Sequence, residues 1–299
     1  LYQEPAVDPG MFEHLVERQA HPERVGDEPQ TLCARLPDLR DHQVARTLGR
    51  QIFGPLLAGD LDYRPGEVAS ALRRFHPEQI HCRVLARESD TPSTQLLRLK
   101  PMDGAFPPFF AGQYVNVFCE VGGVRTSRPY SLASAPSRLG SIDLVVKRKD
   151  DGFVSGHLLD DVSLGDELTV SGPAGSFYWS PLRDTRDLVF VAGGSGIAPF
   201  LGMIDDLLER DAGVSMRLLY GSRREDDIIA KERLDGLAAE HANLWVTHVI
   251  SEPGDDWTGE RGLLDEAFLQ RHLGSAPLAG RTFFLCGPPA LYTLVRENL

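Results

Sequence analysis

The stretch LVFVAGGSGIAPFLGMIDDLLER, residues 188–210, is the feature that most limits how this chain can fold. Apolar β-forming residues run into the glycine-rich turn GGSG at 193–196, and an amphipathic helix pattern follows at once. The dinucleotide-binding pattern G-x-G-x-x-G begins at Gly194, but Pro199 stands in place of its third glycine. The loop is therefore a candidate phosphate site, but of a different type from the G-x-G-x-x-G loop.

The same order of strand and helix repeats to the end of the chain. The apolar runs DLVFVAGG, MRLLYGS, LWVTHVIS and TFFLCGPP are each followed by a helical pattern. We expect these helices near 199–209, 227–240, 263–272 and 290–298. Continuous apolar strands separated by helices indicate a parallel sheet covered on both faces. Residues 184–299 are therefore predicted to form an α/β domain.

Residues 79–183 have a different pattern. The runs CRVLAR, TQLLRLK, QYVNVFCEV, RPYSLAS, SIDLVVKRK and DELTVSGP are short and rich in β-forming residues. Clusters of glycine and proline separate them. This arrangement is typical of a closed antiparallel barrel, which we predict for this part of the chain.

Residues 1–78 are predicted to form a small helical region of unknown role. Helical patterns lie at 10–20, 39–57 and 65–75. Docking of a partner, dimerisation and a purely structural cap all remain open for this region. The spacing of its histidines and of the next one matches no haem or metal motif, so we expect no metal site. These histidines are His14, His21, His42, His76 and His81.

Charge and composition exclude several classes of protein. The formal net charge of −12 and the pI near 5.2 argue against binding to nucleic acid or to an anionic membrane surface. No apolar run is long enough to cross a bilayer, and no signal peptide is visible, so we expect a cytoplasmic protein without a membrane span. The cysteines are too scattered to predict a disulfide framework, a zinc site or an iron–sulfur cluster. They are Cys33, Cys82, Cys119 and Cys286.

The glycine loop is suited to an anion. A helix N-terminus offers unpaired N–H groups and a partial positive charge. Gly193, Gly194 and Gly196 allow the backbone to approach a phosphate without an intervening Cβ. Pro199 fits the first turn of a helix, where its missing N–H costs nothing. A structural turn is the alternative interpretation of the loop alone.

The β half supplies two further candidate sites. In Arg128-Pro129-Tyr130-Ser131, a guanidinium can bind a phosphate, a ring can lie against a flat heterocycle, and a hydroxyl can donate to a ring nitrogen. The stretch GFVS at 152–155 opens a predicted short helix at 154–160, which has the same anion-binding logic. Either motif alone could occur by chance, but the two together in a β region, just ahead of the glycine loop, could not.

From about residue 80 onward, the chain resembles the ferredoxin–NADP reductase superfamily of flavoproteins. RPYSLAS is similar to the flavin motif of this superfamily, and GFVS to its flavin-pyrophosphate motif. VSGPAGSF is similar to the turn at the end of its barrel, GGSGIAPF to its nicotinamide-dinucleotide loop, and CGPP to its nicotinamide-side motif. The motifs occur in the order of the family. The sequence departs from the family where it stops at Leu299, since the last strand of the α/β domain is missing.

The resemblance implies roles for individual residues. Ser131 and Cys286 would be the catalytic residues, near the flavin N5 and the nicotinamide C4 respectively, with Tyr130 against the flavin ring and Arg128 on its phosphate. The full set of implied cofactor-binding residues is Arg128, Pro129, Tyr130, Ser131, Gly152, Phe153, Val154, Ser155, Gly193, Gly194, Ser195, Gly196, Ile197, Pro199, Ser222, Arg223, Cys286, Gly287 and Pro288.

The resemblance favours FAD over FMN, because GFVS would bind a second phosphate. The choice between NADH and NADPH depends on residues 222–227, SRREDD. Ser222, Arg223 and Arg224 could bind a 2′-phosphate, whereas the acidic residues that follow could bind a free 2′-hydroxyl. We favour NADH.

The resemblance implies an enzyme that transfers hydride from NAD(P)H to bound FAD and passes electrons to an iron–sulfur or haem protein. A ferredoxin domain beyond Leu299 could also be the acceptor. Two alternatives remain at this point. One is a free-standing flavin or quinone reductase, and the other is a non-catalytic subunit that binds flavin and nucleotide within a larger complex.

Overall fold

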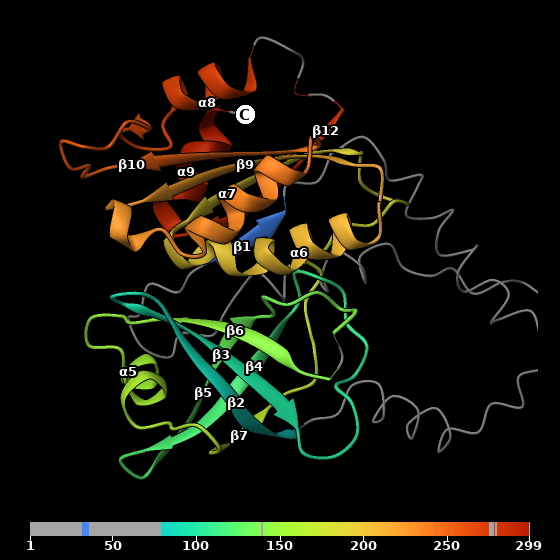
Figure 1. Ribbon diagram of the computed structural model, residues 1–299, viewed down its shortest axis with the longest axis vertical. Coiled ribbons are helices and arrows are strands. Elements are labelled where there is room, and N and C mark those ends of the chain that lie inside the picture. The colour runs from blue at the N-terminus through green and yellow to red at the C-terminus, as the bar shows by residue number, and fades with distance from the viewer. Residues whose placement is uncertain (1–31, 36–78, 139, 275–277, 279, 299) are drawn as a thin grey trace, which may run out of the picture. The chain divides into compact units, whose positions relative to one another are not determined.

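The computed structural model describes residues 32–35, 79–138, 140–274, 278 and 280–298 (Figure 1). The helices predicted at 10–20, 39–57 and 65–75 lie outside these residues, as do His14, His21, His42 and His76. Among the described residues, no helix is long and apolar enough to cross a membrane. The same residues contain no group of three or more His, Cys, Asp or Glu that could hold a metal ion.

The first domain is a six-stranded antiparallel sheet, as predicted, with the strand order β5-β4-β7-β2-β3-β6 (Figure 1). Alternation places one side of each strand inside, so that Val115 and Val117 of β4 are fully buried. The side chains of α5 that face the sheet, including Val154 and Leu158, join the same core. The strands are β2 (Ile80–Thr91), β3 (Thr94–Pro101), β4 (Tyr114–Val121), β5 (Val124–Ser131), β6 (Ile142–Lys147) and β7 (Glu167–Val170).

Helix α5 (Phe153–Asp160) is held at its C-terminal end by an arginine of the sheet. The guanidinium of Arg87, on β2, donates to the carbonyl of Leu159 at 2.5 Å and to that of Val162. These carbonyls lie at the end of the helix, where they lack partners within it and where a cation is favourable. Arg87 thereby fixes the orientation of a helix whose N-terminus begins with the predicted pyrophosphate motif.

The second domain is an α/β domain built on a six-stranded sheet, with the order β1-β12-β8-β9-β10-β11. Strands β12, β8, β9, β10 and β11 are parallel, as predicted. Helices α6 and α7 cover one face, and α8 and α9 cover the other. The elements after the barrel are β8 (Asp187–Gly193), η2 (Gly194–Ile197), α6 (Ala198–Glu209), β9 (Ser215–Ser222), η3 (Glu225–Asp227), α7 (Lys231–Glu240), β10 (Leu244–Ile250), β11 (Glu260–Arg261), α8 (Glu266–Leu273), β12 (Arg281–Gly287) and α9 (Pro289–Asn298).

One edge of this sheet was not expected from the sequence. Strand β1 (Leu32–Arg35) pairs antiparallel with β12, although it lies in the region predicted to be helical. Its pairing places Cys33 opposite Cys286 along the backbone, and Cys286 is disulfide-bonded. The sequence predicted no disulfide framework, and it gave no indication of this single bond at Cys286. Sequence spacing could not reveal the pairing of β1 with β12, because it joins strands about 250 residues apart in the chain.

The barrel and the α/β domain share a hydrophobic core. Ala133 and Phe177 of the barrel region pack in one cluster with residues of α6 and of the parallel sheet. The ring of Phe177 meets that of Phe284 edge-on, with centroids 5.4 Å apart. On α6, a Cβ added at Gly202 would lie 2.8 Å from the carbonyl oxygen of Leu132, so this helix lies directly against the end of the flavin motif. The two domains are therefore held in a fixed arrangement by close packing.

Candidate functional site

The two predicted nicotinamide motifs meet at one edge of the parallel sheet. From β8 the chain moves outward through β9, β10 and β11, while β12 lies on the other side of β8. Ligands of such sheets bind at the carboxyl ends of the strands, where the strand order reverses. The loops after β8 and β12 both lie at this point. A Cβ at Gly193 would lie 2.8 Å from Pro288 Cδ, and one at Gly196 would overlap the carbonyl oxygen of Cys286.

The glycine loop has the geometry that an anion site needs. Gly194 has φ +54°, a conformation that L side chains rarely adopt, and a Cβ there would meet nothing within 4 Å. The loop continues as the short 3₁₀ helix η2 and then as α6, with Pro199 in its first turn. The N–H groups at this helix start are the groups that would bind a pyrophosphate. Open space at Gly194 and tight packing at Gly196 fit a loop whose outer side receives a ligand.

A tyrosine of the sheet, which the sequence motifs did not indicate, supports this loop through a hydrogen bond. Tyr220, on β9, is fully buried, and its hydroxyl donates to the carbonyl of Gly194 at 3.1 Å. The same hydroxyl accepts a hydrogen bond from the N–H of Ile229, also at 3.1 Å. Burial raises the pKa of Tyr220, so it stays protonated. The available signal was a tyrosine inside an otherwise apolar strand, since a buried hydroxyl needs a partner.

The flavin motif lies on β5, an edge strand of the barrel sheet. Arg128, Tyr130 and Ser131 are half-buried, whereas Pro129 is exposed. The guanidinium of Arg128 donates to Thr126 Oγ1 and to the carbonyl of Ser127, each at 2.9 Å. Tyr130 packs against the barrel core. Arg128, Tyr130 and Ser131 are thus partly exposed on this strand, which fits the flavin role that the sequence predicts.

The second predicted flavin element, GFVS, forms the start of α5. The Ser155 hydroxyl accepts from the N–H of Lys149 at 3.2 Å and donates to the carbonyl of Gly152 at 3.2 Å. A Cβ at Gly152 would overlap this hydroxyl. Ser155 and Gly152 therefore close the turn that presents the helix N-terminus, while Phe153 is 45% exposed and Val154 is buried. Their contact with a phosphate stays a prediction.

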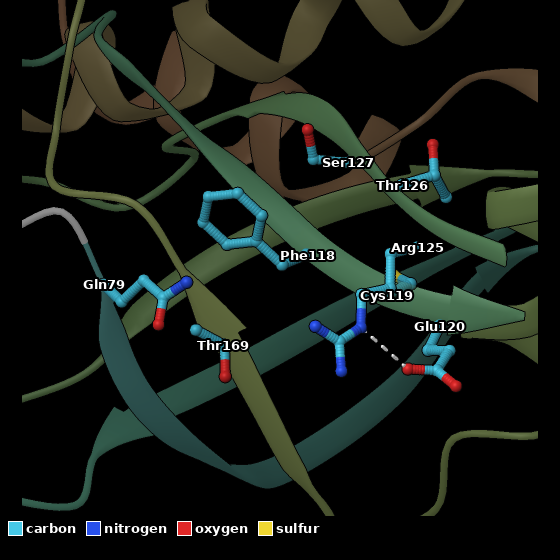
Figure 2. A pocket seen from close by; sticks show the side chains of 8 residues that line it. All are labelled: Gln79, Phe118, Cys119, Glu120, Arg125, Thr126, Ser127 and Thr169. Carbon is cyan, nitrogen blue, oxygen red and sulfur yellow. Dashed lines mark hydrogen bonds and ion pairs between the residues drawn. The ribbon is translucent and has the colours of Figure 1, made fainter. Parts of the chain in front are cut away.

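A cavity that the sequence did not predict lies beside the flavin motif. This cavity of about 460 Å³ opens on the barrel between β4, β5 and β7 (Figure 2). Arg125 and Glu120 form an ion pair of 3.1 Å at its rim. Burial raises the pKa of the Cys119 thiol, which favours its uncharged form. The lining residues are Gln79, Phe118, Cys119, Glu120, Arg125, Thr126, Ser127 and Thr169.

The segment after β9, which would choose between NADH and NADPH, has its arginines paired. Arg223 Nε lies 2.9 Å from Glu252 Oε2, and Arg224 lies 3.1 Å from Asp226. Asp227 turns toward the barrel, where its carboxylate lies 3.7 Å from Lys147 Nζ. Ser222 is half-buried, and its carbonyl accepts the N–H of Ser251. Both arginines thus already have carboxylate partners.

The motif after β12 is placed as predicted, with one change in its chemistry. Cys286 is 1% exposed and Gly287 is buried, whereas Pro288 is exposed beside Gly193. Because Cys286 is disulfide-bonded, it offers no free thiol in this structure. Its predicted role near the nicotinamide therefore rests on its backbone and on the turn that it begins. The role itself stays a prediction.

Two family models match the chain. An oxidoreductase FAD-binding domain matches residues 81–179, and an oxidoreductase NAD-binding domain matches residues 190–297. These matches coincide with the barrel and with the parallel sheet. The chain therefore carries an FAD-binding domain followed by an NAD-binding domain.

Curated relatives and a solved structure are similar to more than half of this chain. The reductase component DmpP of phenol 2-monooxygenase from Pseudomonas sp. (strain CF600) is 34% identical, over 75% of this chain and 64% of the relative. NADH-cytochrome b5 reductase 2 from Scheffersomyces stipitis is also 34% identical, over 62% of each chain. The cytochrome P450 reductase GcoB from Amycolatopsis is 28% identical with a TM-score of 0.66, over 75% of this chain and 66% of GcoB. The chain thus spans less than two thirds of these curated relatives.

Proposed function

Because the chain belongs to the ferredoxin–NADP reductase superfamily of flavoproteins, we propose that it is an NADH-dependent FAD reductase of an electron-transfer system. The observation that carries the proposal is the meeting of the GGSG and CGPP loops at the carboxyl ends of β8 and β12. The flavin motif lies on a barrel packed directly against the same domain. One chain thereby supplies both nucleotide sites at a fixed relative position.

The residues of the chain have separable tasks in this function. Arg128 and the N-terminus of α5 would hold the phosphates of FAD, and Tyr130 and Ser131 would orient its ring. The glycine loop would hold the pyrophosphate of the nicotinamide nucleotide, with Gly287 and Pro288 shaping the adjacent turn. FAD, when bound, supplies the chemistry that accepts two electrons together and releases them singly. The contribution of the protein is to align the two nucleotides.

NADH is the proposed electron donor. A 2′-phosphate needs cationic side chains that are not already paired. Arg223 and Arg224 each form an ion pair with a carboxylate. The neighbouring Glu225 offers an acidic partner for a free 2′-hydroxyl. The name of a relative, NADH-cytochrome b5 reductase 2, supports the same choice.

The proposed acceptor is an iron–sulfur or haem protein. One relative is the reductase component of a monooxygenase, and another is named a reductase of cytochrome b5. An electron-transfer component of anthranilate 1,2-dioxygenase from Acinetobacter baylyi is 32% identical over 64% of this chain. The proposal includes a cytoplasmic location, since its electron donor is an intracellular metabolite.

An anaerobic absorbance titration tests this function. The purified protein is titrated with NADH and, separately, with NADPH, and the flavin band is followed. Bleaching at lower NADH than NADPH concentration is the expected result. A flavin band that bleaches with neither nucleotide would contradict the reductase and favour a non-catalytic subunit. Rapid reoxidation by free flavin or quinone, but not by an iron–sulfur or haem protein, would contradict the proposed acceptor.

A further inference from the structure

We propose that the Tyr220 hydroxyl is a positioning group that joins the two halves of the dinucleotide site and so sets the affinity for the nucleotide. The inference rests on the proposed function. One half is the glycine loop, residues 193–199, and the other is the segment 221–230 between β9 and α7. The two halves are separated in the sequence by α6, the loop that follows it and β9. They meet in the sheet, where Gly193 pairs with Gly221 at the ends of β8 and β9.

The geometry of the hydroxyl is that of a bridge. It donates to the carbonyl of Gly194 and accepts from the N–H of Ile229, each at 3.1 Å. Tyr220 has no exposed surface, so water cannot replace either bond without opening the site. Gly194 is the residue of the loop with positive φ. The bond therefore fixes the peptide that determines where the next N–H groups point.

The segment 221–230 is also held by the turn after β10, because the carbonyls of Ser222 and Arg223 accept the N–H groups of Ser251 and Glu252. The barrel makes further contacts with it. Asp90, on β2, accepts the N–H of Ala230 at 2.9 Å, and Ala230 has φ +56°. Lys147 and Ser93 of the barrel lie 3.7 and 3.4 Å from the carboxylate of Asp227. These contacts hold the segment against the flavin domain. Besides the strand pairing of Gly193 with Gly221, the Tyr220 hydroxyl is a side-chain link from the segment to the glycine loop.

Loss of the hydroxyl leaves two buried backbone groups unpaired. Relaxation of either loop would satisfy them and would move the loops apart. Because the flavin motif lies on the barrel, this change should weaken nucleotide binding while leaving flavin binding intact. A purely structural tyrosine would instead lower the melting temperature without a selective effect on the nucleotide.

The test compares Tyr220→Phe with the wild-type holoenzyme. We expect the KM for NADH, and the Kd for NAD⁺ measured by calorimetry, to rise about 5- to 10-fold, the size that one lost hydrogen bond supports. The rate of flavin reduction at saturating NADH and the ratio of FAD to protein should change less than twofold. The calorimetric Kd reports binding independently of turnover.

Thr282→Val is the matched control. It removes another buried hydroxyl of the same sheet, one that accepts the N–H of Thr185 at 2.9 Å at the opposite ends of the strands. It should lower the melting temperature to a similar degree without changing KM or Kd. An unchanged Kd for NAD⁺ in Tyr220→Phe, or an equal rise in Thr282→Val, would overturn the inference. Failure of the wild-type protein to be reduced by NADH would instead contradict the proposed function.

Discussion

At the scale of single residues, Gly196 is a position where a larger residue would collide with the backbone of another strand. A Cβ at this position would overlap the carbonyl oxygen of Cys286, which belongs to the neighbouring strand. Backbone cannot yield as a flexible side chain does, so Gly196→Ala must displace one of the two nucleotide loops. We expect the KM for NADH to rise at least about 10-fold, with a loss of roughly 1–3 kcal/mol in stability from overpacking.

Gly236→Ala is the control for this substitution. Gly236 lies within α7, and a Cβ there would meet nothing within 4 Å. Alanine should stabilise the helix by up to about 1 kcal/mol and leave the kinetics unchanged. Steady-state kinetics and thermal melts of both variants check the prediction. An unchanged KM in Gly196→Ala would show that the two loops can separate without affecting the nucleotide.

The ion pair between Arg223 and Glu252 gives a prediction about nucleotide choice. The pair is largely exposed, so it holds Arg223 only weakly. Glu252→Gln should release the guanidinium and raise kcat/KM for NADPH relative to NADH about two- to fivefold. Adding Arg223→Gln to this variant should abolish the gain. A gain that survives in the double variant would exclude Arg223 as its cause.

At the scale of elements, Arg87 links the barrel sheet to α5, the helix proposed to bind the flavin phosphates. Its guanidinium satisfies the carbonyls at the end of α5, so Arg87→Ala should loosen the helix that begins with Gly152 and Ser155. We expect the Kd for FAD to rise about 5- to 20-fold, since charged hydrogen bonds contribute about 1.5–3 kcal/mol.

Arg83→Ala is a matched control from the same strand. Arg83 makes an exposed ion pair of 3.2 Å with Glu167, so its removal should leave FAD binding unchanged. The ratio of flavin to protein after dialysis, and fluorescence titration of the apoprotein with FAD, measure both variants. Equal loss of flavin from the two variants would assign the effect to strand β2 as a whole.

The elements were predictable to the extent that their signals are local. The apolar runs of β8, β9, β10 and β12 and the helical patterns between them identified the parallel sheet. Strand β11 has only two residues, and β1 forms through pairing with a strand at the far end of the chain. Neither leaves a periodic pattern, so neither could be found from sequence.

In the candidate site, too, local sequence signals could be predicted, whereas contacts between distant segments could not. The glycines of residues 193–196 were identified by their order in the chain, but the reason for Gly196 lies in Cys286, ninety residues later. Arg87 and Tyr220 were missed because each acts on backbone carbonyls of a distant segment. A backbone carbonyl has no signature in sequence. Motifs therefore identified the residues proposed to face the nucleotides and not the groups that support those residues.

At the scale of the whole molecule, stability should depend on pH through His248. This residue of β10 is 9% exposed and bonds through Nε2 to Asp235 of α7 at 2.8 Å, with Lys231 on the other carboxylate oxygen. Burial lowers the pKa of His248 below its ordinary value of 6.5, and the partial compensation by Asp235 does not reverse this. The folded protein therefore takes up a proton here less readily than the unfolded chain.

The consequence is a loss of stability as the pH falls below about 6.5, because the unfolded chain then binds more protons than the folded protein. The loss stops once the pH is below the pKa of the folded state. His248→Gln keeps a donor for Asp235 but does not titrate, so its melting temperature should fall less between pH 7.5 and 5.5 than that of the wild type. Buried carboxylates such as Asp205, whose pKa burial raises, act with the opposite sign, but they are present in both proteins and cancel in the comparison. Parallel melting curves for the two proteins would place the pH dependence of stability elsewhere in the molecule.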